Sequence, residues 1–399
     1  MSFVVMAFIF GQICLLRLAE IVISLYSNGC RLRVERHYMK WCKLNNLLEF
    51  FSGKRVMITG HTGFKGSWLT FLLREYGAHV LGYSLEPNHD NYLFNILNLS
   101  NRIDHTSGDI RDYQKLSTTM NNFSPDFVFH LAAQAFVKQS YVDPVETFST
   151  NIMGATNILE SVRNCKSVRS FVVVTSDKCY ENLEQIWGYR EVDLLGGRDP
   201  YSASKASVEI VYSSYVRSFF SERNNLGSAT ARAGNVIGGG DLSPNRIIPD
   251  CIRALQSNQN VVLRNPDSTR PWQHVLDPIN GYLVLAKKLY DSPEKFQGSW
   301  NFGPTTNDVM TVKNVAEFIS KNLGGKSVKI DDDKHLNHEA NLLQLNCEKA
   351  QQLLNWKCTW GIERALHETA RWYKVVLANG NAEEITRDQI ANFYEGKND

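Results

Sequence analysis

A tyrosine and a lysine stand four residues apart, directly after a proline. Tyr201 and Lys205 follow Pro200, and a proline at the first helical position predicts that a helix starts there. Side chains four residues apart share one helix face, so the ammonium should lie near the phenol. A free tyrosine, with a pKa of about 10, is a poor base at neutral pH. A neighbouring ammonium lowers that pKa, so the pair predicts a base that takes a proton from a hydroxyl.

Three polar residues follow a run that predicts a buried strand. Ser176, Asp177 and Lys178 come shortly after the β-branched run 172–174. Ligands of open parallel sheets bind outside the carboxyl ends of the strands. We therefore expect Ser176 to hydrogen-bond the same substrate hydroxyl that Tyr201 deprotonates. The alternative is a capped strand end with a solvated ion pair.

A glycine-rich loop follows the apolar run 55–59, which predicts the first strand. Its spacing is GxxGxxG rather than GxGxxG, and glycines here would let the backbone turn tightly and aim N–H groups at a pyrophosphate. Taken alone, the loop is also compatible with an ordinary strand-to-helix turn. Its place after the first strand of an alternating pattern favours a nicotinamide dinucleotide, whose charged ring would lower the pKa of the tyrosine further. The expected cofactor contacts here are Gly60, Thr62, Gly63, Phe64, Lys65 and Gly66.

The residues expected at the adenosine half leave two alternatives open. An acidic residue usually ends the second strand and binds the ribose, but Ser84 stands there and Glu86 comes two residues later. Either the Glu86 carboxylate or the Ser84 hydroxyl would contact the ribose. Lys65 inside the loop would favour a 2′-phosphate, so NADP stays open although NAD is expected. Further cofactor contacts are expected at Asp109, for the adenine amino group, and at Ile110, Leu131, Ala132, Ala133 and Gln134; each of these positions also suits a polar strand end or tight packing.

The order of elements that must position these groups predicts the fold. Short β-branched runs alternate with helical stretches from residue 54 onward, which is typical of a parallel sheet with crossover helices. We therefore expect an α/β, Rossmann-type doubly wound sheet with a smaller C-terminal substrate-binding part. The expected division assigns 51–235 and about 272–303 to the dinucleotide domain, and 236–271 and 304–399 to the substrate-binding part.

Composition excludes several classes of partner and site. The 399 residues carry 43 Lys and Arg against 41 Asp and Glu, a formal net charge of +2, so no global field would recruit nucleic acid. The eight cysteines form neither a CxxC pair nor a Cys/His cluster. We therefore expect reduced thiols in a cytoplasmic protein and no metal site.

The first 50 residues are expected to be an extension outside the fold. The apolar run from Phe3 to Leu16 is shorter than the roughly 20 residues that a bilayer crossing needs. No basic residue precedes it and no clear cleavage site follows it, unlike a signal peptide. A non-functional extension or an upstream start, with Met39 as the initiator, is favoured over a weak membrane-associating helix, and stable insertion is not expected.

Longer strings around these residues carry a family resemblance. The chain resembles extended short-chain dehydrogenases/reductases of the sugar-nucleotide dehydratase family from about residue 50 to near the C-terminus. Many such dehydratases carry Thr-Asp-Glu where this chain has Ser176-Asp177-Lys178, and the lysine is typical of the CDP-glucose branch. The strings that carry the resemblance are TGHTGFKGSWL (59–69), HLAAQAFVKQSY (130–141), TSDKCYEN (175–182), PYSASK (200–205), RAGNVIGGGD (232–241) and RPWQHVLDP (270–278).

The resemblance implies a 4,6-dehydration of CDP-glucose with recycled NAD. Tyr201 and Lys205 would assist oxidation at C4′, Lys178, if held neutral, would remove the C5′ proton, and Asp177, if held protonated, would protonate the departing C6′ hydroxyl. Hydride would return to C6′, giving a 4-keto-6-deoxy sugar used in bacterial surface polysaccharides such as O-antigen. The expected substrate contacts are Gln134, Ser140, Asn235, Arg246, Arg264 and Arg270.

The sequence leaves two alternative functions possible and does not determine the oligomeric state. A sugar-nucleotide 4-epimerase or dehydrogenase would share the glycine loop, Tyr201 and Lys205 but would not need Asp177 and Lys178. A non-catalytic dinucleotide-binding protein could lose the tyrosine or lysine, and both are present. Many relatives pair as homodimers through the Tyr-Lys helix and its neighbour; the apolar residues 208–215 suit that arrangement and also suit burial within one subunit.

Overall fold

The runs predicted as strands lie side by side in one parallel sheet. The strand order is β11-β6-β5-β4-β1-β2-β3. From β1 the chain adds β2 and β3 on one side and then β4, β5, β6 and β11 on the other, so the order reverses between β1 and β4 while all strands stay parallel. At that point Thr59 pairs with His130, so the two strands end level with each other. The predicted doubly wound fold is therefore confirmed. The strands are β1 Arg55–Thr59, β2 His79–Ser84, β3 Asp104–Ser107, β4 Phe127–His130, β5 Ser170–Val174, β6 Gly227–Ala233 and β11 Gly298–Phe302.

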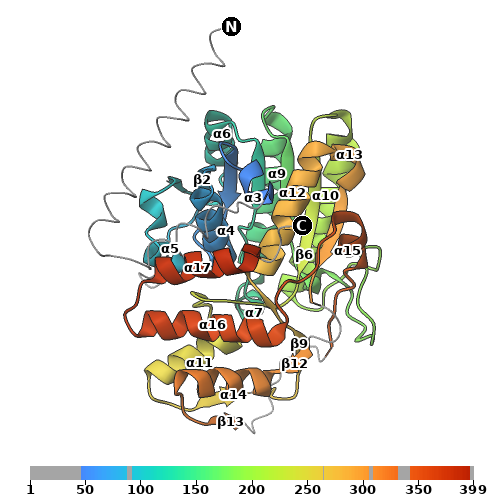
Figure 1. Ribbon diagram of the computed structural model, residues 1–399. Coiled ribbons are helices and arrows are strands. Elements are labelled where there is room, and N and C mark those ends of the chain that lie inside the picture. The colour runs from blue at the N-terminus through green and yellow to red at the C-terminus, as the bar shows by residue number, and fades with distance from the viewer. Residues whose placement is uncertain (1–45, 88–91, 264, 305–308, 331–341, 396–399) are drawn as a thin grey trace, which may run out of the picture. The chain divides into compact units, whose positions relative to one another are not determined.

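Figure 1 shows this arrangement in a computed structural model of the chain. The structure describes residues 46–87, 92–263, 265–304, 309–330 and 342–395. The expectations for residues 1–45 of the N-terminal extension, including Met39, fall outside these residues. So does Arg264. The expectation that the extension runs to residue 50 is wrong, because Asn46–Phe50 forms a helix whose Leu48 is buried and whose Phe50 packs against Phe127 of the sheet. Among the described residues, no helix is both long and apolar enough to cross a membrane.

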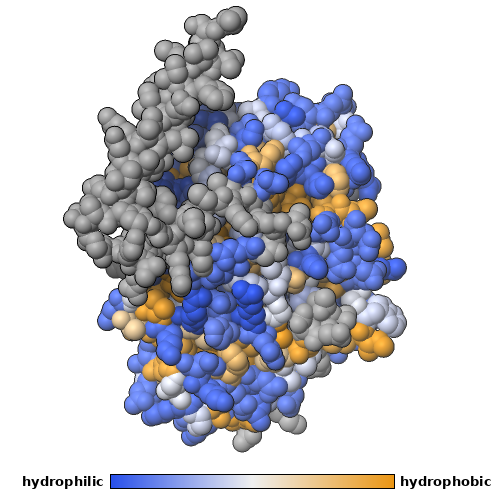
Figure 2. Space-filling model, in the orientation of Figure 1, coloured by the Kyte–Doolittle hydropathy of each residue, from blue (hydrophilic) through white to orange (hydrophobic). Residues whose placement is uncertain are grey.

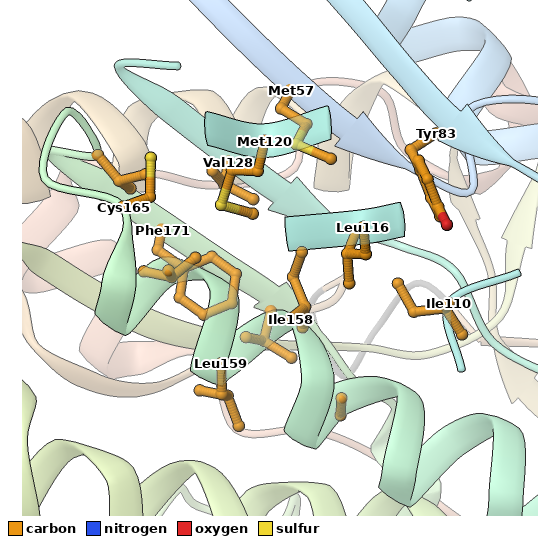
Figure 3. Close-up of a cluster of buried hydrophobic side chains, with 14 of the residues drawn as sticks. Met57, Tyr83, Ile110, Leu116, Met120, Val128, Ile158, Leu159, Cys165 and Phe171 are labelled. Carbon is orange, nitrogen blue, oxygen red and sulfur yellow. The ribbon is translucent and has the colours of Figure 1, made fainter. Parts of the chain in front are cut away.

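Successive side chains of a strand point to opposite faces of the sheet, and all four side chains of β4 are buried. Both faces are therefore buried, and helices cover both. Val128 enters a core formed with α6 (Tyr113–Phe123), α9 (Gly154–Asn164) and α10 (Pro200–Ser218), which Figure 3 shows. The preceding residue, Phe127, packs against Phe51 and Tyr290 on the other side. There α12 (Leu276–Asp291) contacts α3 (Asn46–Phe50) and α4 (Phe64–Glu75).

The segments after β6 form smaller paired units. Strand β8 pairs in parallel with β13, β9 pairs antiparallel with β12, and helix α11 (Ile247–Gln256) packs on α14 (Val312–Leu323). Figure 1 shows α11 and α14 near α16 (Ile362–Leu377). The division into a dinucleotide part and a substrate part stays a prediction. The strands of these segments are β7 Val236–Ile237, β8 Val261–Leu263, β9 Thr269–Pro271, β10 Gln273–His274, β12 Val309–Thr311 and β13 Val328–Ile330.

Shorter elements and the C-terminal helices complete the described chain. Figure 2 shows that hydrophilic side chains make up much of the described surface on the face in view, broken by smaller hydrophobic areas. The remaining elements are α5 Leu93–Ile96, η1 Leu99–Asn101, α7 Val137–Val142, α8 Pro144–Phe148, η2 Ser149–Met153, η3 Asp177–Cys179, η4 Phe220–Glu222, α11 Ile247–Gln256, α13 Pro293–Phe296, α14 Val312–Leu323, α15 Glu348–Leu354, α16 Ile362–Leu377 and α17 Ala382–Tyr394.

Candidate active site

The start of helix α10 is fixed beside the end of β5. Asp199 caps the helix, because its side chain accepts hydrogen bonds from the backbone N–H of Ser202 at 2.9 Å and from that residue's hydroxyl at 2.6 Å. Pro200 occupies the first turn, as the sequence predicted. Such a cap satisfies N–H groups that a helix end leaves unpaired. Tyr201 and Lys205 follow one turn apart, and both are buried.

The phenol of Tyr201 lies in an environment that favours its neutral form. Burial raises the pKa of Tyr201 to about 12; a hydrogen bond with Ser176 and the charge of Arg246 lower it, whereas Asp177 raises it. In the unliganded protein, burial therefore outweighs the hydrogen bond and the nearby cation that lower this pKa. The expectation that Lys205 and a charged nicotinamide ring lower it stays a prediction.

The ammonium of Lys205 is held at the end of β5. Its Nζ donates a long hydrogen bond, 3.5 Å, to the carbonyl oxygen of Val174. Burial lowers the pKa of Lys205 to about 8, and the carboxylate of Glu209 opposes that shift. His130 lies nearby at the end of β4; burial and then the charge of Lys205 lower its pKa to about 3. A neutral His130 contacts Thr59 Oγ1 at 2.7 Å and ties β4 to β1 at the reversal point.

The Ser176-Asp177-Lys178 segment forms a short 3-10 turn at the end of β5. The Ser176 hydroxyl accepts from the backbone N–H of Lys178 at 3.2 Å and donates to Asp177 Oδ1 at 2.9 Å. Asp177 is buried, and Lys178 is half-buried. A Cβ at Gly234 would lie 3.1 Å from Asp177 Oδ2, so this glycine lets the β6 end approach the carboxylate closely. The turn thus brings three polar side chains to the strand end beside Tyr201.

Each glycine of the loop 60–66 has a different neighbour. Gly60 has a φ of +75°, and a Cβ there would meet the backbone N of Ala132 at 2.6 Å. A Cβ at Gly66 would meet the carbonyl oxygen of Gly60 at 2.1 Å. Gly63 is exposed, precedes helix α4 and provides no side-chain cap. The loop therefore presents the N-terminus of a 12-residue helix with room for an anion in front of it.

The two candidate ribose residues lie in different networks. Ser84 contacts the hydroxyl of Thr62 at 2.8 Å, which joins the end of β2 to the glycine loop. Glu86 is mostly exposed and lies 3.1 Å from His105 Nε2. His105 in turn contacts His61 Nε2 at 2.7 Å. Both Ser84 and Glu86 lie close to the loop, so both alternatives for the ribose stay predictions.

The expected adenine contacts are held by neighbouring side chains. Asp109 forms a bidentate ion pair with Arg111, whose hydrogen bonds lower the pKa of that carboxyl. Ile110 is buried, and Figure 3 shows its side chain in the core cluster under α6 and α9. Any contact of Ile110 with a cofactor would therefore come from its backbone. Asn157 already donates to its carbonyl oxygen.

The segment after β4 is half-buried from Leu131 to Gln134 and is braced internally. Leu131 donates its backbone N–H to Thr59, and Ala133 lies in the same half-buried run. The Gln134 amide donates to the Thr147 hydroxyl at 2.8 Å and to the Phe136 carbonyl at 3.1 Å. The Ser140 hydroxyl is fully buried and donates to a backbone carbonyl of its own helix. In this structure, therefore, Gln134 and Ser140 hold the loop in place, and their substrate contacts stay predictions.

Cations gather on the substrate side of the site. Arg246 lies 3.4 Å from Asp241 and over the ring of Phe136. Burial lowers the pKa of Lys65 to about 8, with Arg246 and Lys205 lowering it and Asp177 raising it. The charges that act on Lys65 are thus those of the reaction site, and neither Ser84 nor Glu86 is among them.

The remaining expected substrate residues are spread around this area. Asn235 is half-buried directly after β6. Arg270 is buried within β9 and donates to the carbonyl oxygen of Thr269 at 2.8 Å. Among the described residues, no cluster of His, Cys, Asp and Glu has the geometry of a metal site. The structure thus brings Ser176, Asp177, Tyr201 and Lys205 together, and places Arg246 and Lys65 beside them.

Sequence reasoning missed two acidic residues beside this group. Glu209 lies one turn beyond Lys205 on α10 and is buried. Its spacing of four from Lys205 was a signal that could have been used. Asp241 ends the string RAGNVIGGGD and accepts from Arg246; its backbone carbonyl accepts from Tyr373 of α16 at 2.7 Å. That second contact joins residues 132 positions apart, which spacing does not reveal.

Comparisons with known proteins agree with this geometry. The sequence model of the GDP-mannose 4,6 dehydratase family matches residues 57–369. The chain is 44% identical over 349 residues to the CDP-glucose 4,6-dehydratase of Salmonella typhimurium, covering 86% of this chain and 97% of that protein.

More distant relatives include other activities on nucleotide sugars. The chain is 25% identical over 337 residues to a UDP-glucose 4-epimerase of Halalkalibacterium halodurans, covering 80% of this chain and 95% of the epimerase. The crystal structure of a dTDP-glucose 4,6-dehydratase from Streptomyces venezuelae with NAD bound has a TM-score of 0.69 at 22% identity, covering 82% of this chain and 99% of that one. This last likeness supports the fold.

Proposed function

Because the chain belongs to the GDP-mannose 4,6-dehydratase family, we propose that it converts CDP-glucose to CDP-4-keto-6-deoxyglucose with a retained NAD. One observation carries this proposal. The turn with Asp177 and Lys178 lies beside Tyr201, which contacts Ser176. An acid and a base for elimination thus stand next to a group for alcohol oxidation. The similarity to the Salmonella typhimurium enzyme supports CDP-glucose as the substrate.

The residues of the glycine loop fit a dinucleotide. The open position at Gly63 and the uncapped start of α4 leave room for a pyrophosphate, and Gly60 and Gly66 permit the close packing beneath it. When bound, NAD would accept a hydride from C4′ and later return it to C6′. Its positive ring would also add a cation beside a phenol whose pKa burial raises to about 12. The base form of Tyr201 would then become accessible near neutral pH.

The chain's own groups would move the protons. Tyr201 would take the C4′ hydroxyl proton, with Ser176 hydrogen-bonded to the same oxygen. The resulting ketone acidifies C5′, where Lys178 would act as base. Asp177 would give a proton to the C6′ hydroxyl, which leaves as water. Return of the hydride to C6′ and of a proton from Lys178 to C5′ would complete the cycle, so no net oxidation of the sugar would occur.

The substrate diphosphate would lie against Lys65 and Arg246. Lys65 and Arg246 carry like charges, and the charge of Arg246 lowers the pKa of Lys65, so an anion bound between the two would reduce their repulsion. The guanidinium of Arg246 has a fork shape that matches phosphate oxygens. Its partner Asp241, at 3.4 Å, leaves part of that fork for a ligand.

Incubation of the purified protein with CDP-glucose tests the proposal. We expect a product with the alkali-induced absorbance of a 4-keto-6-deoxy sugar, and faster turnover with CDP-glucose than with UDP-, dTDP- or GDP-glucose. Recovery of unchanged or epimerised sugar would refute the dehydratase assignment and favour the epimerase, to which the 25% identical relative belongs. Preference for another nucleotide would refute the assignment of the base alone.

We further propose a cytoplasmic location, a homodimer and a use for the product. Buried free thiols, such as Cys165, Cys179 and Cys251, support a reducing cytoplasm. On α10, Val208 and Tyr212 are buried whereas Ile210 is 60% exposed, so one apolar side chain of this run is available to a second copy in a homodimer. The product would supply later enzymes that make deoxy sugars for surface polysaccharides.

A further inference from the structure

A single buried carboxylate connects the two segments that carry the catalytic side chains. Glu209, 3% exposed, accepts a hydrogen bond from the Thr175 hydroxyl at 2.5 Å. Thr175 immediately precedes Ser176 and Asp177, so this bond fixes the end of β5. Glu209 itself lies on α10, one turn after Lys205 and two turns after Tyr201. The strand end and the helix are therefore joined through one side chain.

The same carboxylate is anchored from the opposite side. Arg232 of β6 donates to Glu209 Oε2 at 2.8 Å, and both side chains are at most 2% exposed. Thr230 of β6 and Ser299 of β11 donate to the same oxygen at 2.7 Å and 3.0 Å. Arg232 also donates to the Tyr180 hydroxyl at 2.7 Å, in the chain just beyond the catalytic turn. The network thus contacts both segments that carry reacting groups: helix α10, through Glu209, and the turn after β5, through Thr175 and Tyr180.

Stability alone does not account for a buried ion pair, which is often no more stabilising than apolar residues of the same volume. The many hydrogen bonds of this network instead fix a single arrangement of the groups. That property matters most where reacting groups must be held within a fraction of an ångström.

We propose that Glu209 is a positioning residue for the reaction, holding Ser176 and Asp177 through Thr175 and holding Lys205 through the shared helix. This inference rests on the proposed function for its kinetic consequences. The hydroxyl of Thr175 connects Glu209 to the segment that bears Ser176 and Asp177. The hydroxyl of Thr230 binds the same carboxylate to strand β6, which bears no reacting group.

Glu209 also acts on the charge of Lys205. Its carboxylate raises the pKa of Lys205, which burial lowers to about 8, and the buried Cys179 acts in the same direction. Burial raises the pKa of Glu209, but the charge and hydrogen bond of Arg232 on β6, together with bonds from Thr175 and Thr230, lower it overall. Removal of the negative charge would therefore let the pKa of Lys205 fall further. Protonated Lys205 would then be lost at a lower pH.

Three variants separate positioning from general stability. Thr175→Val removes the bond to the strand end, Thr230→Val removes the matched bond to β6, and Glu209→Gln removes the charge. We expect kcat to fall about 10–100-fold for Thr175→Val, since small misplacements of reacting groups have effects of this size. The loss for Thr230→Val should be at least tenfold smaller. Equal losses for the two threonine variants would overturn the positioning role.

A titration without substrate completes the test. Wild-type and variant proteins labelled with ¹³C at the lysine ε-carbon would be followed by NMR, with the Lys205 signal assigned by its loss in Lys205→Arg. We expect Glu209→Gln to lower the midpoint of Lys205, with Thr175→Val leaving it in place. The alkaline limb of kcat should move in parallel for Glu209→Gln.

The turnover assay and the Lys205 titration together distinguish a failure of the proposed dehydratase function from a failure of the proposed role of Glu209. Absence of CDP-glucose turnover in the wild type, with the Lys205 midpoint still lowered in Glu209→Gln, would reject the function and keep the electrostatic role of Glu209. Normal turnover in the wild type with an unchanged midpoint and unchanged kcat in Glu209→Gln would reject the positioning role. Circular dichroism and retained NAD verify that each variant is folded.

Discussion

Around Tyr201 and Lys205 the side chains are buried and hydrogen-bonded to protein groups, whereas around Lys65 and Arg246 they are half-buried cations with few protein partners. The first region has its geometry fixed before any ligand arrives, through Glu209, Arg232 and the threonines. In the second, Arg246 is paired with Asp241, and the charge of Arg246 still acts on Lys65, so a bound anion would reduce the repulsion between the two cations. The difference supports the proposal that the protein supplies the reaction geometry and that the substrate diphosphate completes the binding region.

The largest effect should come from the phenol at the reaction region. Tyr201→Phe removes the base and should lower turnover at least about 10³-fold, within the range that general bases contribute. NAD binding should be retained, because the glycine loop is untouched. Steady-state turnover of CDP-glucose and the NAD content of the purified variant measure the two properties. Tyr215→Phe, on the same helix, is the matched control and should keep wild-type turnover; activity in Tyr201→Phe would contradict the assignment.

The elimination step should be separable from the oxidation step. Lys178→Met removes the proposed C5′ base while Tyr201 and Lys205 remain, so turnover should fall about 10²-fold or more. Oxidation at C4′ would still occur, and NADH absorbance at 340 nm should appear on mixing with substrate. A variant that dehydrates normally would remove Lys178 from the mechanism. One that forms no NADH would assign it to the oxidation instead.

At the binding region the effect should be smaller and should fall on KM. Arg246→Met removes a charged hydrogen-bond donor to phosphate, a loss of about 1.5–3 kcal/mol. We expect KM for CDP-glucose to rise about 10–100-fold with kcat changed much less. Arg74→Met removes an exposed arginine of α4 paired with Glu75 and serves as control. A fall in kcat at constant KM would place Arg246 in the reaction region and break the comparison.

The smallest effect is expected at the ribose end. Glu86 is 60% exposed and lies against His105, so Glu86→Gln should change the Kd of NAD by only about threefold. Calorimetric titration of the apoprotein measures this. A loss of tenfold or more would show that the carboxylate, rather than Ser84, holds the ribose.

Local residue patterns were sufficient for part of the site. Pro200 predicted the start of α10, and the apolar runs predicted the strands that the structure ends at Thr59, His130 and Val174. These features depend on backbone geometry and on neighbours within one turn or one strand. Glu209 was missed because its partners lie far away in the sequence: Thr175, directly after β5, is 34 residues away and Arg232 of β6 is 23 residues away.

Electrostatics could not be predicted from sequence spacing. The expectation that Lys205 and the nicotinamide ring lower the pKa of Tyr201 took no account of burial. Burial, which depends on the packing of the whole sheet and its helices, raises that pKa to about 12 in the unliganded protein. In the same way, the charges that act on Lys65 followed only from the folded chain.

The sequence by itself determined the doubly wound sheet, the glycine loop, the positions of the polar strand ends and the family. Each depends on residue type and short-range spacing, or on strings long enough to be specific. The tertiary structure decided which of these groups meet, how deeply they are buried and which protons they hold. Those properties depend on contacts between distant segments and on the exclusion of water, which only the folded chain creates.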